Sequence, residues 1–152
     1  MSHHLKIVLV EPEIPQNTGN IARTCVALGA ELHIVKPIMF DISDRAAKRA
    51  GLDYWKDLKL IIHESLGGFL AENPPDNMYF CSTKAKRLYT EVEYPEDVFL
   101  VFGKETKGLP EPLIFGNPDR AVKIPMLPGI RSLNLSNSVA VVAYEAVRQN
   151  GL

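Results

Sequence analysis

Short apolar runs rich in β-branched residues alternate with segments of helical apolar spacing, and this alternation constrains the fold more than any other feature. The apolar runs predict strands at residues 5–10, 31–35, 58–63, 78–82, 98–102 and 121–124. The other segments predict helices at 18–28, 44–50 (ended by Gly51), 110–115 and 136–150, and from the Ser65 cap to Ala71. Strands alternating with helices favour a mostly parallel sheet with helices on both faces. The sequence therefore predicts an α/β protein, and its length suits one domain, residues 1–152.

The boundaries of two predicted helices are inferred from capping residues in the nearby sequence. Asn17 or Thr18 is expected to be the N-cap of the first helix, after a loop at 11–19 with two prolines and a glycine. Gly29 is expected to end that helix, because glycine readily takes the backbone conformation that follows a last turn. Ser136 is either the N-cap of the last helix or a polar contact of a ligand.

The net charge of −1 gives no sign of a dedicated nucleic-acid-binding protein, which often carries a clear basic excess. Any RNA-binding surface would therefore be local. Two basic clusters are candidates, and each is either a solvated face or an RNA contact. They are Arg45, Lys48 and Arg49, and Lys84, Lys86 and Arg87.

Several kinds of protein and of chemistry find no support in the sequence. No apolar run reaches the roughly 20 residues that span a bilayer, and the start lacks a signal-peptide pattern, so no membrane role is expected. Cys25 and Cys81 are far apart and form no C-x-x-C pair, which fits a reducing cytoplasm. Dinucleotide, phosphate-loop and serine-hydrolase motifs are missing. The histidines lack metal-site spacing, so no metal is expected, and His33 and His63 are expected to be structural.

Three loops that follow predicted strands are dense in polar residues, glycine and proline. They lie at residues 11–23, 103–109 and 125–137. In a parallel sheet, ligands bind outside the carboxyl ends of the strands. We therefore expect these loops to meet in one binding site.

The same loops carry a resemblance to a known family. Their motifs are EPEIPQNTGN at 11–20 with Arg23, LVFGKETKGL at 100–109, and IPM at 124–126 with RSLNLSNS at 131–138. In order and spacing they resemble the three motifs of the trefoil-knot (SPOUT) RNA 2′-O-methyltransferases, and the likeness spans nearly the whole chain. It is closest to the minimal tRNA (cytidine(34)-2′-O)-methyltransferases, in which the catalytic domain is the entire protein.

This resemblance implies a fold, a cofactor and a reaction. It implies a deep C-terminal trefoil knot and a homodimer whose active site takes residues from both chains. The cofactor would be S-adenosyl-L-methionine, with S-adenosyl-L-homocysteine as product. The substrate would be the ribose 2′-hydroxyl of nucleotide 34, a cytidine or modified uridine, in the anticodon stem-loop of tRNA. Two alternatives stay open: a 2′-O-methyltransferase for another tRNA position or for rRNA, and a catalytically inactive RNA- or nucleotide-binding module.

By the same likeness, particular residues receive roles. The catalytic polar residues would be Arg23, Asn17, Glu105 and Asn134, and the cofactor contacts would be Cys81, Gly103, Ile124, Ser132 and Leu133. Arginine keeps its charge, so a clamp on the target phosphate that also stabilises a developing oxyanion is favoured for Arg23 over proton abstraction.

Other residues keep two interpretations. Glu105 either pairs with an arginine of its own or of the partner chain, or faces solvent in a loop. Gly103 and Gly108 either let the backbone approach a purine or only form tight turns. Tyr54 and Trp55 either stack on an RNA base or pack in the core or dimer.

Overall fold

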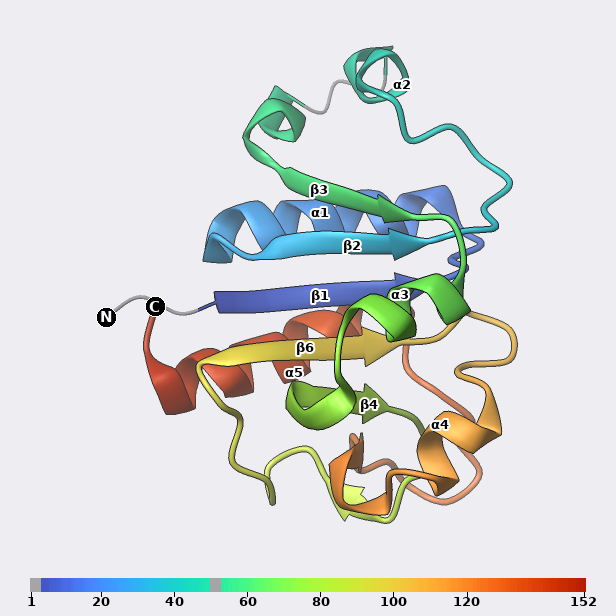
Figure 1. Ribbon diagram of the computed structural model, residues 1–152, viewed down its shortest axis with the longest axis vertical. Coiled ribbons are helices and arrows are strands. Elements are labelled where there is room, and N and C mark those ends of the chain that lie inside the picture. Colours follow the sequence, from blue (N-terminus) through green and yellow to red (C-terminus); the bar gives the residue numbers. More distant parts are fainter. Residues whose placement is uncertain (1–3, 50–52) are drawn as a thin grey trace.

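Seven parallel strands form one sheet in the computed structural model, which describes residues 4–49 and 53–152 (Figure 1). Within these residues the strand order is β3-β2-β1-β6-β4-β7-β5. Every pair of neighbouring strands is parallel, as the alternation of strands and helices predicted. The strands are β1 (His4–Val10), β2 (Glu31–Val35), β3 (Lys59–His63), β4 (Met78–Cys81), β5 (Arg87–Leu88), β6 (Asp97–Phe102) and β7 (Ala121–Lys123).

Helices cover both faces of this sheet (Figure 1). α1 and α5 contact each other on one face, and α3 and α4 lie on the other. The predicted α/β class is confirmed, whereas the trefoil knot stays a prediction of the resemblance. In the described ranges no helix is long and apolar enough to cross a membrane. The helices are α1 (Pro15–Leu28), α2 (Asp44–Arg49), α3 (Leu66–Glu72), α4 (Glu111–Phe115) and α5 (Leu135–Asn150), with 3₁₀ turns η1 (Asp53–Asp57), η2 (Pro75–Asn77) and η3 (Pro118–Arg120).

The sheet separates two apolar layers, and the central strand β1 contributes to both. Successive side chains of a strand point to opposite faces. Ile7 and Leu9 therefore pack with Ile21 of α1 in one layer, while Val8 packs with Phe69 of α3 in the other. All five side chains are fully buried. Tight packing on both faces fixes the carboxyl edge of the sheet, from which the motif loops emerge.

The first helix begins at Pro15, three residues before its predicted start. Its N-cap residue is Ile14, whose side chain makes no capping hydrogen bond. The Glu105 carboxylate accepts a hydrogen bond from the backbone N–H of Ile14 at 2.9 Å instead. The prediction that Asn17 or Thr18 caps the helix was wrong because the acceptor comes from a distant loop, which local sequence does not show.

The other helix ends follow the local signals more closely. Gly29 ends α1 with a φ of 65°, and the Ser65 side chain accepts a hydrogen bond from the first turn of α3, as predicted. Asn134, not Ser136, is the N-cap of α5, because its side chain accepts hydrogen bonds from two N–H groups of the first turn. The predicted end of the helix at 44–50, with Gly51, lies outside the described residues.

His33 and His63 form a structural pair on adjacent strands, as expected from their positions. Their rings stack with centroids 5.1 Å apart, and His33 Nδ1 lies 2.9 Å from His63 Nε2. The other nitrogen of His33 lies 2.9 Å from a carboxylate oxygen of Glu31. Burial lowers the pKa of His33 below its ordinary value of 6.5, and the hydrogen bond with Glu31 opposes that shift.

This pair predicts acid sensitivity. A histidine with a lowered pKa takes up a proton more readily in the unfolded chain, so its contribution to stability is present at neutral pH and is lost as the pH falls below 6.5. We expect His33→Phe to reduce the fall in the free energy of unfolding between pH 7.5 and pH 5.5, measured by urea unfolding. The matched change His4→Phe, at the exposed start of β1, should leave that fall unchanged. An equal fall in all three proteins would contradict the assignment.

Candidate active site

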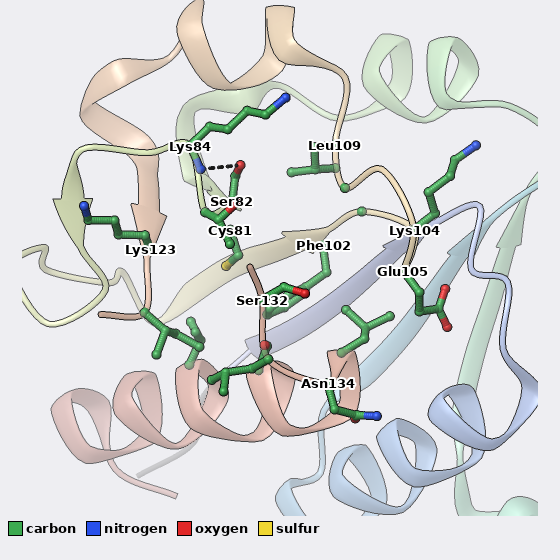
Figure 2. Close-up of a pocket in the computed structure, with 18 of the residues that line it drawn as sticks. Cys81, Ser82, Lys84, Phe102, Lys104, Glu105, Leu109, Lys123, Ser132 and Asn134 are labelled. Atoms are coloured by element: carbon green, nitrogen blue, oxygen red, sulfur yellow. Dashed lines mark hydrogen bonds between the residues drawn. The ribbon is translucent and has the colours of Figure 1, made fainter. Parts of the chain in front are cut away.

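A cavity of about 330 Å³ opens at the carboxyl ends of β4, β6 and β7, beside the start of α5 (Figure 2). We call it the main pocket. Each motif loop lines it: the first through Asn17, the second through Gly103 and the third through Ser132. The three loops therefore meet in one place, as the sequence predicted.

The residues that the likeness assigns to the cofactor share this pocket. Cys81 is the last residue of β4, Gly103 directly follows β6, and Ile124 directly follows β7. The loop between β7 and α5 supplies the other two. All five line the main pocket: Cys81, Gly103, Ile124, Ser132 and Leu133. Their role in binding a cofactor stays a prediction, and their placement supports it.

The lining of the main pocket suits a nucleoside. Apolar side chains form much of its wall, and hydroxyl and amide groups stand among them, as in most small-molecule sites. Burial raises the pKa of the Cys81 thiol well above its usual range, so this cysteine stays protonated and acts as wall rather than nucleophile. The apolar group includes Phe102, Leu109, Val122, Ile124, Leu133, Leu135 and Val142, and the polar group includes Ser82, Thr83, Ser132, Asn134 and Ser138.

The two glycines of the second motif close a tight loop. A Cβ at Gly103 would lie 2.0 Å from the backbone carbon of Gly108, a distance that no side chain tolerates. Gly108 has a φ of +68°, a conformation that favours glycine. The close approach at Gly103 is therefore between two parts of the loop itself, which supports the tight-turn interpretation.

Glu105 fastens the second loop to the start of α1. Its carboxylate accepts hydrogen bonds from the backbone N–H groups of Glu13 at 2.8 Å and Ile14 at 2.9 Å. It also accepts one from the Asn17 side chain at 3.1 Å. These oxygens therefore serve the helix start rather than solvent or an arginine of the same chain, while pairing with an arginine of a partner chain stays a prediction.

Glu13 of the first loop in turn binds Thr106 of the second loop. Its carboxylate accepts hydrogen bonds from the backbone N–H of Thr106 at 2.9 Å and from the Thr106 hydroxyl at 2.8 Å. The backbone hydrogen bond is the main cause that lowers the pKa of Glu13. The first and second loops are thus joined by two carboxylates that face opposite ways. We call Glu13, Glu105 and Thr106 the carboxylate clamp.

Asn17 and Asn134 place two amides at the end of the main pocket where Glu105 stands. Asn17 is only 5% exposed and is held by its bond to Glu105. Figure 2 shows Asn134 at the start of α5, on the Glu105 side of the pocket. Its Oδ1 accepts hydrogen bonds from the N–H and the hydroxyl of Ser136 at 2.9 Å and 2.6 Å. Its NH₂ group is therefore the half of the amide left to face a ligand.

The two halves of this amide can be tested separately. Asn134→Ala removes the cap and should lower the free energy of unfolding by about 1 kcal/mol. Asn134→Asp keeps an oxygen acceptor at a helix N-terminus, where negative charge is favourable, so its stability should match the native protein. Urea unfolding checks both expectations. A loss of stability in Asn134→Asp as large as in Asn134→Ala would show that the cap is not what this side chain contributes.

Arg23 lies outside the main pocket. It is an exposed residue of α1, six positions beyond Asn17. Six residues of α-helix advance about 9 Å and turn through about 240°, so the two side chains leave the helix on different faces. Within one chain, the structure therefore brings together Asn17, Glu105 and Asn134 but leaves Arg23 elsewhere.

The remaining candidates have mixed outcomes. Trp55 is 8% exposed and belongs to the apolar layer under α1, so its packing interpretation is confirmed, while the side chain of Tyr54 lies outside the described residues.

In the second basic cluster, Arg87 donates hydrogen bonds to the carbonyls of Asp119 and Glu91 and is structural. In the described part of the chain, no group of three or more His, Cys, Asp or Glu is placed to hold a metal ion.

Sequence reasoning missed several parts of the pocket. The loop after β4, at 82–84, was not predicted to line the pocket, although Lys84 was named in a basic cluster and any loop after a parallel strand of this sheet is a candidate. Lys123 and Val142 also line the pocket, but they lie inside a predicted strand and a predicted helix, whereas the prediction considered only loops. Glu13 lies inside the first motif but received no role, because only its pairing with Thr106 reveals one.

Comparisons with known proteins find matches over nearly the whole chain. The SpoU rRNA Methylase family matches residues 4–144. The tRNA (cytidine(34)-2′-O)-methyltransferase of Saccharophagus degradans is 45% identical over 146 residues, which cover 95% of both chains. A solved structure described as giving structural insights into the 2-OH methylation of C/U34 on tRNA is 44% identical, with a TM-score of 0.88, and the match covers 97% of each chain.

A more distant structure shares the fold. The SpoU methyltransferase AviRb from Streptomyces viridochromogenes, in complex with the cofactor AdoMet, is 23% identical and has a TM-score of 0.79. The match covers 99% of the present chain and 62% of that one. At this identity the likeness shows the fold alone.

Proposed function

The chain belongs to the SpoU rRNA methylase family, and we propose that it methylates the ribose 2′-hydroxyl of nucleotide 34 of a tRNA with S-adenosyl-L-methionine as methyl donor. The observation that most strongly supports this reaction is that the three motif loops meet in the main pocket. The choice of nucleotide rests on relatives of that named activity, 44–45% identical over nearly the full length. Free cysteines at positions 25 and 81 fit action in the reducing cytoplasm.

The main pocket fits the proposed donor. Its apolar wall can take the adenine ring, and the polar groups of Ser132 and Ser138 can meet a ribose or an amino acid. When bound, the cofactor supplies the reactive methyl group, and the protein supplies orientation and electrostatics. We assign Cys81, Gly103 and Leu133, with Ile124 and Ser132, to this binding.

The polar end of the pocket would hold the target ribose. Positioning dominates a methyl transfer, because the attacking oxygen needs to stand in line with the methyl group. The Asn134 NH₂ is placed to donate to a ribose oxygen, and Glu105 acts through the helix start and Asn17 rather than on the substrate. Glu105 is therefore a positioning residue in this proposal.

A homodimer would complete the site. Arg23 lies outside the main pocket of its own chain, so we propose that it serves the pocket of a partner subunit, where it stabilises charge developing on the 2′-oxygen. Two exposed apolar residues of α5, Val141 and Tyr144, support a partner, because burial of such a face is favourable. A two-fold dimer is the commonest closed assembly.

The experiment that tests the proposed function follows labelled methyl groups into RNA. The protein is incubated with labelled S-adenosyl-L-methionine and a synthetic anticodon stem-loop, and the modified nucleotide is mapped by mass spectrometry. The control RNA is identical but carries a 2′-deoxyribose at nucleotide 34. We expect label in the first RNA and none in the second. Equal label in both would place the methyl group elsewhere and refute the proposal.

A further inference from the structure

A second cavity lies on the other side of the α1 start and has no part in the site described above. It has a volume of about 420 Å³, within the range of small-molecule sites, roughly 300–1,000 Å³. We call it the α1–α2 pocket. Residues of α1, of the segment before α2, of α2 itself and of η1 line it: Pro15, Gln16, Thr18, Gly19, Asn20, Phe40, Asp41, Ile42, Ser43, Ala46, Ala47 and Trp55.

The most informative residue of this pocket is Thr18. It is 2% exposed, and no partner for its hydroxyl Oγ1 is found among the residues that the structure describes. Buried hydroxyl groups nearly always have a hydrogen-bond partner, since leaving one without a partner costs free energy. Thr18 lines the cavity, and a buried hydroxyl without a described partner in such a wall points to a ligand with a polar edge.

Other groups around the pocket offer the same kind of contact. The side-chain amides of Gln16 and Asn20 lie one turn apart on α1, are exposed, and make no hydrogen bond to the described residues. The Asp41 carboxylate accepts a hydrogen bond from the Ser43 N–H at 2.9 Å and keeps further acceptor capacity. Donors and acceptors thus surround an interior with an aromatic wall at Phe40 and Trp55.

The short helix α2 adds positive charge beside the pocket. Ala46 and Ala47 of this helix line the cavity, and the first basic cluster, Arg45, Lys48 and Arg49, occupies its exposed positions. Arg49 lies 3.8 Å from the Asp41 carboxylate. Arg45 and Lys48 are exposed and form no ion pair with the side chains that the structure describes, although Arg45 is close enough to Asp41 to lower the pKa of its carboxyl. An apolar pocket with polar edges beside exposed cations is the pattern of a site for an unstacked nucleotide.

The location relates this pocket to the reaction. Asn17 lines the main pocket, and its neighbours Gln16 and Thr18 line the α1–α2 pocket. The first turns of one helix thus separate the two cavities, and a helix with its side chains is about 10–12 Å across. A single RNA strand could therefore reach both pockets with nucleotides that are close in sequence.

We infer that the α1–α2 pocket binds one unpaired nucleobase of the RNA substrate, close in sequence to the nucleotide that is methylated. The Thr18 hydroxyl and the amides of Gln16 and Asn20 read the polar edge of the base, and Arg45 and Lys48 hold the adjoining phosphates. This inference rests on the proposed function, because it assumes an RNA substrate in the main pocket. It assigns the RNA contact to the cluster on α2.

The first test is Thr18→Val, which removes the hydroxyl and keeps the shape of the side chain. We expect its affinity for the anticodon stem-loop to fall about 2- to 10-fold, the effect of one net hydrogen bond, with thermal stability equal to or above the native protein. The matched control is Thr24→Val on the same helix, because Thr24 does not line the pocket and its hydroxyl donates to the backbone carbonyl of Asn20. Its RNA affinity should be that of the native protein.

The second test identifies which base of the RNA enters the pocket and which cations contact its phosphates. Stem-loops with one abasic nucleotide next to position 34 are titrated against native protein and Thr18→Val. For the base that enters the pocket, the two losses of affinity should not add, because each removes the same contact. Arg45→Gln and Lys48→Gln should each lower the slope of log Kd against log salt concentration by about 0.7, the value for one phosphate contact to a single strand. Lys59→Gln, at the amino end of β3, should leave that slope unchanged.

The outcomes separate this inference from the proposed function. If the native protein methylates nucleotide 34 while Thr18→Val, Arg45→Gln and Lys48→Gln all bind RNA normally, the inference is overturned and the proposed function stands. If Thr18→Val instead changes the oligomeric state of the protein in analytical ultracentrifugation, a second copy of the chain fills the pocket. The inference is then also wrong. A native protein that binds the stem-loop but transfers no methyl group would refute the proposed function alone.

Discussion

Glu105→Ala is expected to lower the rate of methyl transfer by about 100-fold, although Glu105 touches no substrate in our proposal. The substitution leaves two backbone N–H groups at the start of α1 and the Asn17 amide without their shared acceptor. Asn17 then loses its fixed position at the end of the main pocket, and a displacement of about 1 Å in a reacting site is enough for a loss of this size. Single-turnover kinetics with labelled cofactor measure it.

Stability should fall as well, by about 1–3 kcal/mol in urea unfolding, because hydrogen bonds to a charged group are among the stronger ones. Glu111→Ala is the control. Its carboxylate pairs with Lys84 on the surface, with both side chains at least half exposed, so its loss should cost less than about 1 kcal/mol. If Glu105→Ala keeps its stability but loses activity, Glu105 acts directly in the reaction, and its assignment as a positioning residue is wrong.

The carboxylate clamp also explains which parts of the fold were predictable. The strands and most helix ends follow from patterns a few residues long, such as Gly29 after α1 and Ser65 before α3. The start of α1 does not, because the Ile14 N–H is satisfied by a residue 91 positions away. The two-residue strand β5 was missed for a related reason. It exists only through pairing with β7, and its own sequence carries too few residues for a pattern.

In the candidate site, too, some parts were predictable from the sequence and others were not. Residues that follow strands, such as Cys81 and Ile124, were placed correctly by the rule that parallel strands present their ligands at one edge. The α1–α2 pocket was not predicted, because it needs the loop before α2 to return against α1. No periodicity encodes that approach. Thr18, first considered as a helix cap, has a different position: the residue lines a cavity, and its hydroxyl is buried without a described partner.

Arg23→Lys is expected to reduce the rate of methyl transfer by about 100- to 1,000-fold, the loss that follows removal of a donor to a developing oxyanion. Lysine keeps the charge but presents a point charge instead of the planar fork of the guanidinium. Cofactor binding should not change, because Arg23 lies outside the main pocket of its own chain. Isothermal titration with S-adenosyl-L-homocysteine checks that point. Turnover near that of the native protein would show that the fork is not needed.

Mixing two inactive proteins tests whether Arg23 serves a partner subunit. One chain carries Arg23→Ala, and the other carries Ser132→Trp, which fills the main pocket. In a mixed dimer with shared sites, the intact pocket of the first chain meets the intact Arg23 of the second, so one site of two works. Random pairing should then restore about a quarter of the native activity, since half of the dimers are mixed. If each pocket uses its own Arg23, every site in the mixture lacks one part, and no activity returns. Restored activity would therefore require both the dimer and the shared site, whereas an inactive mixture with confirmed mixed dimers would remove Arg23 from the partner's pocket.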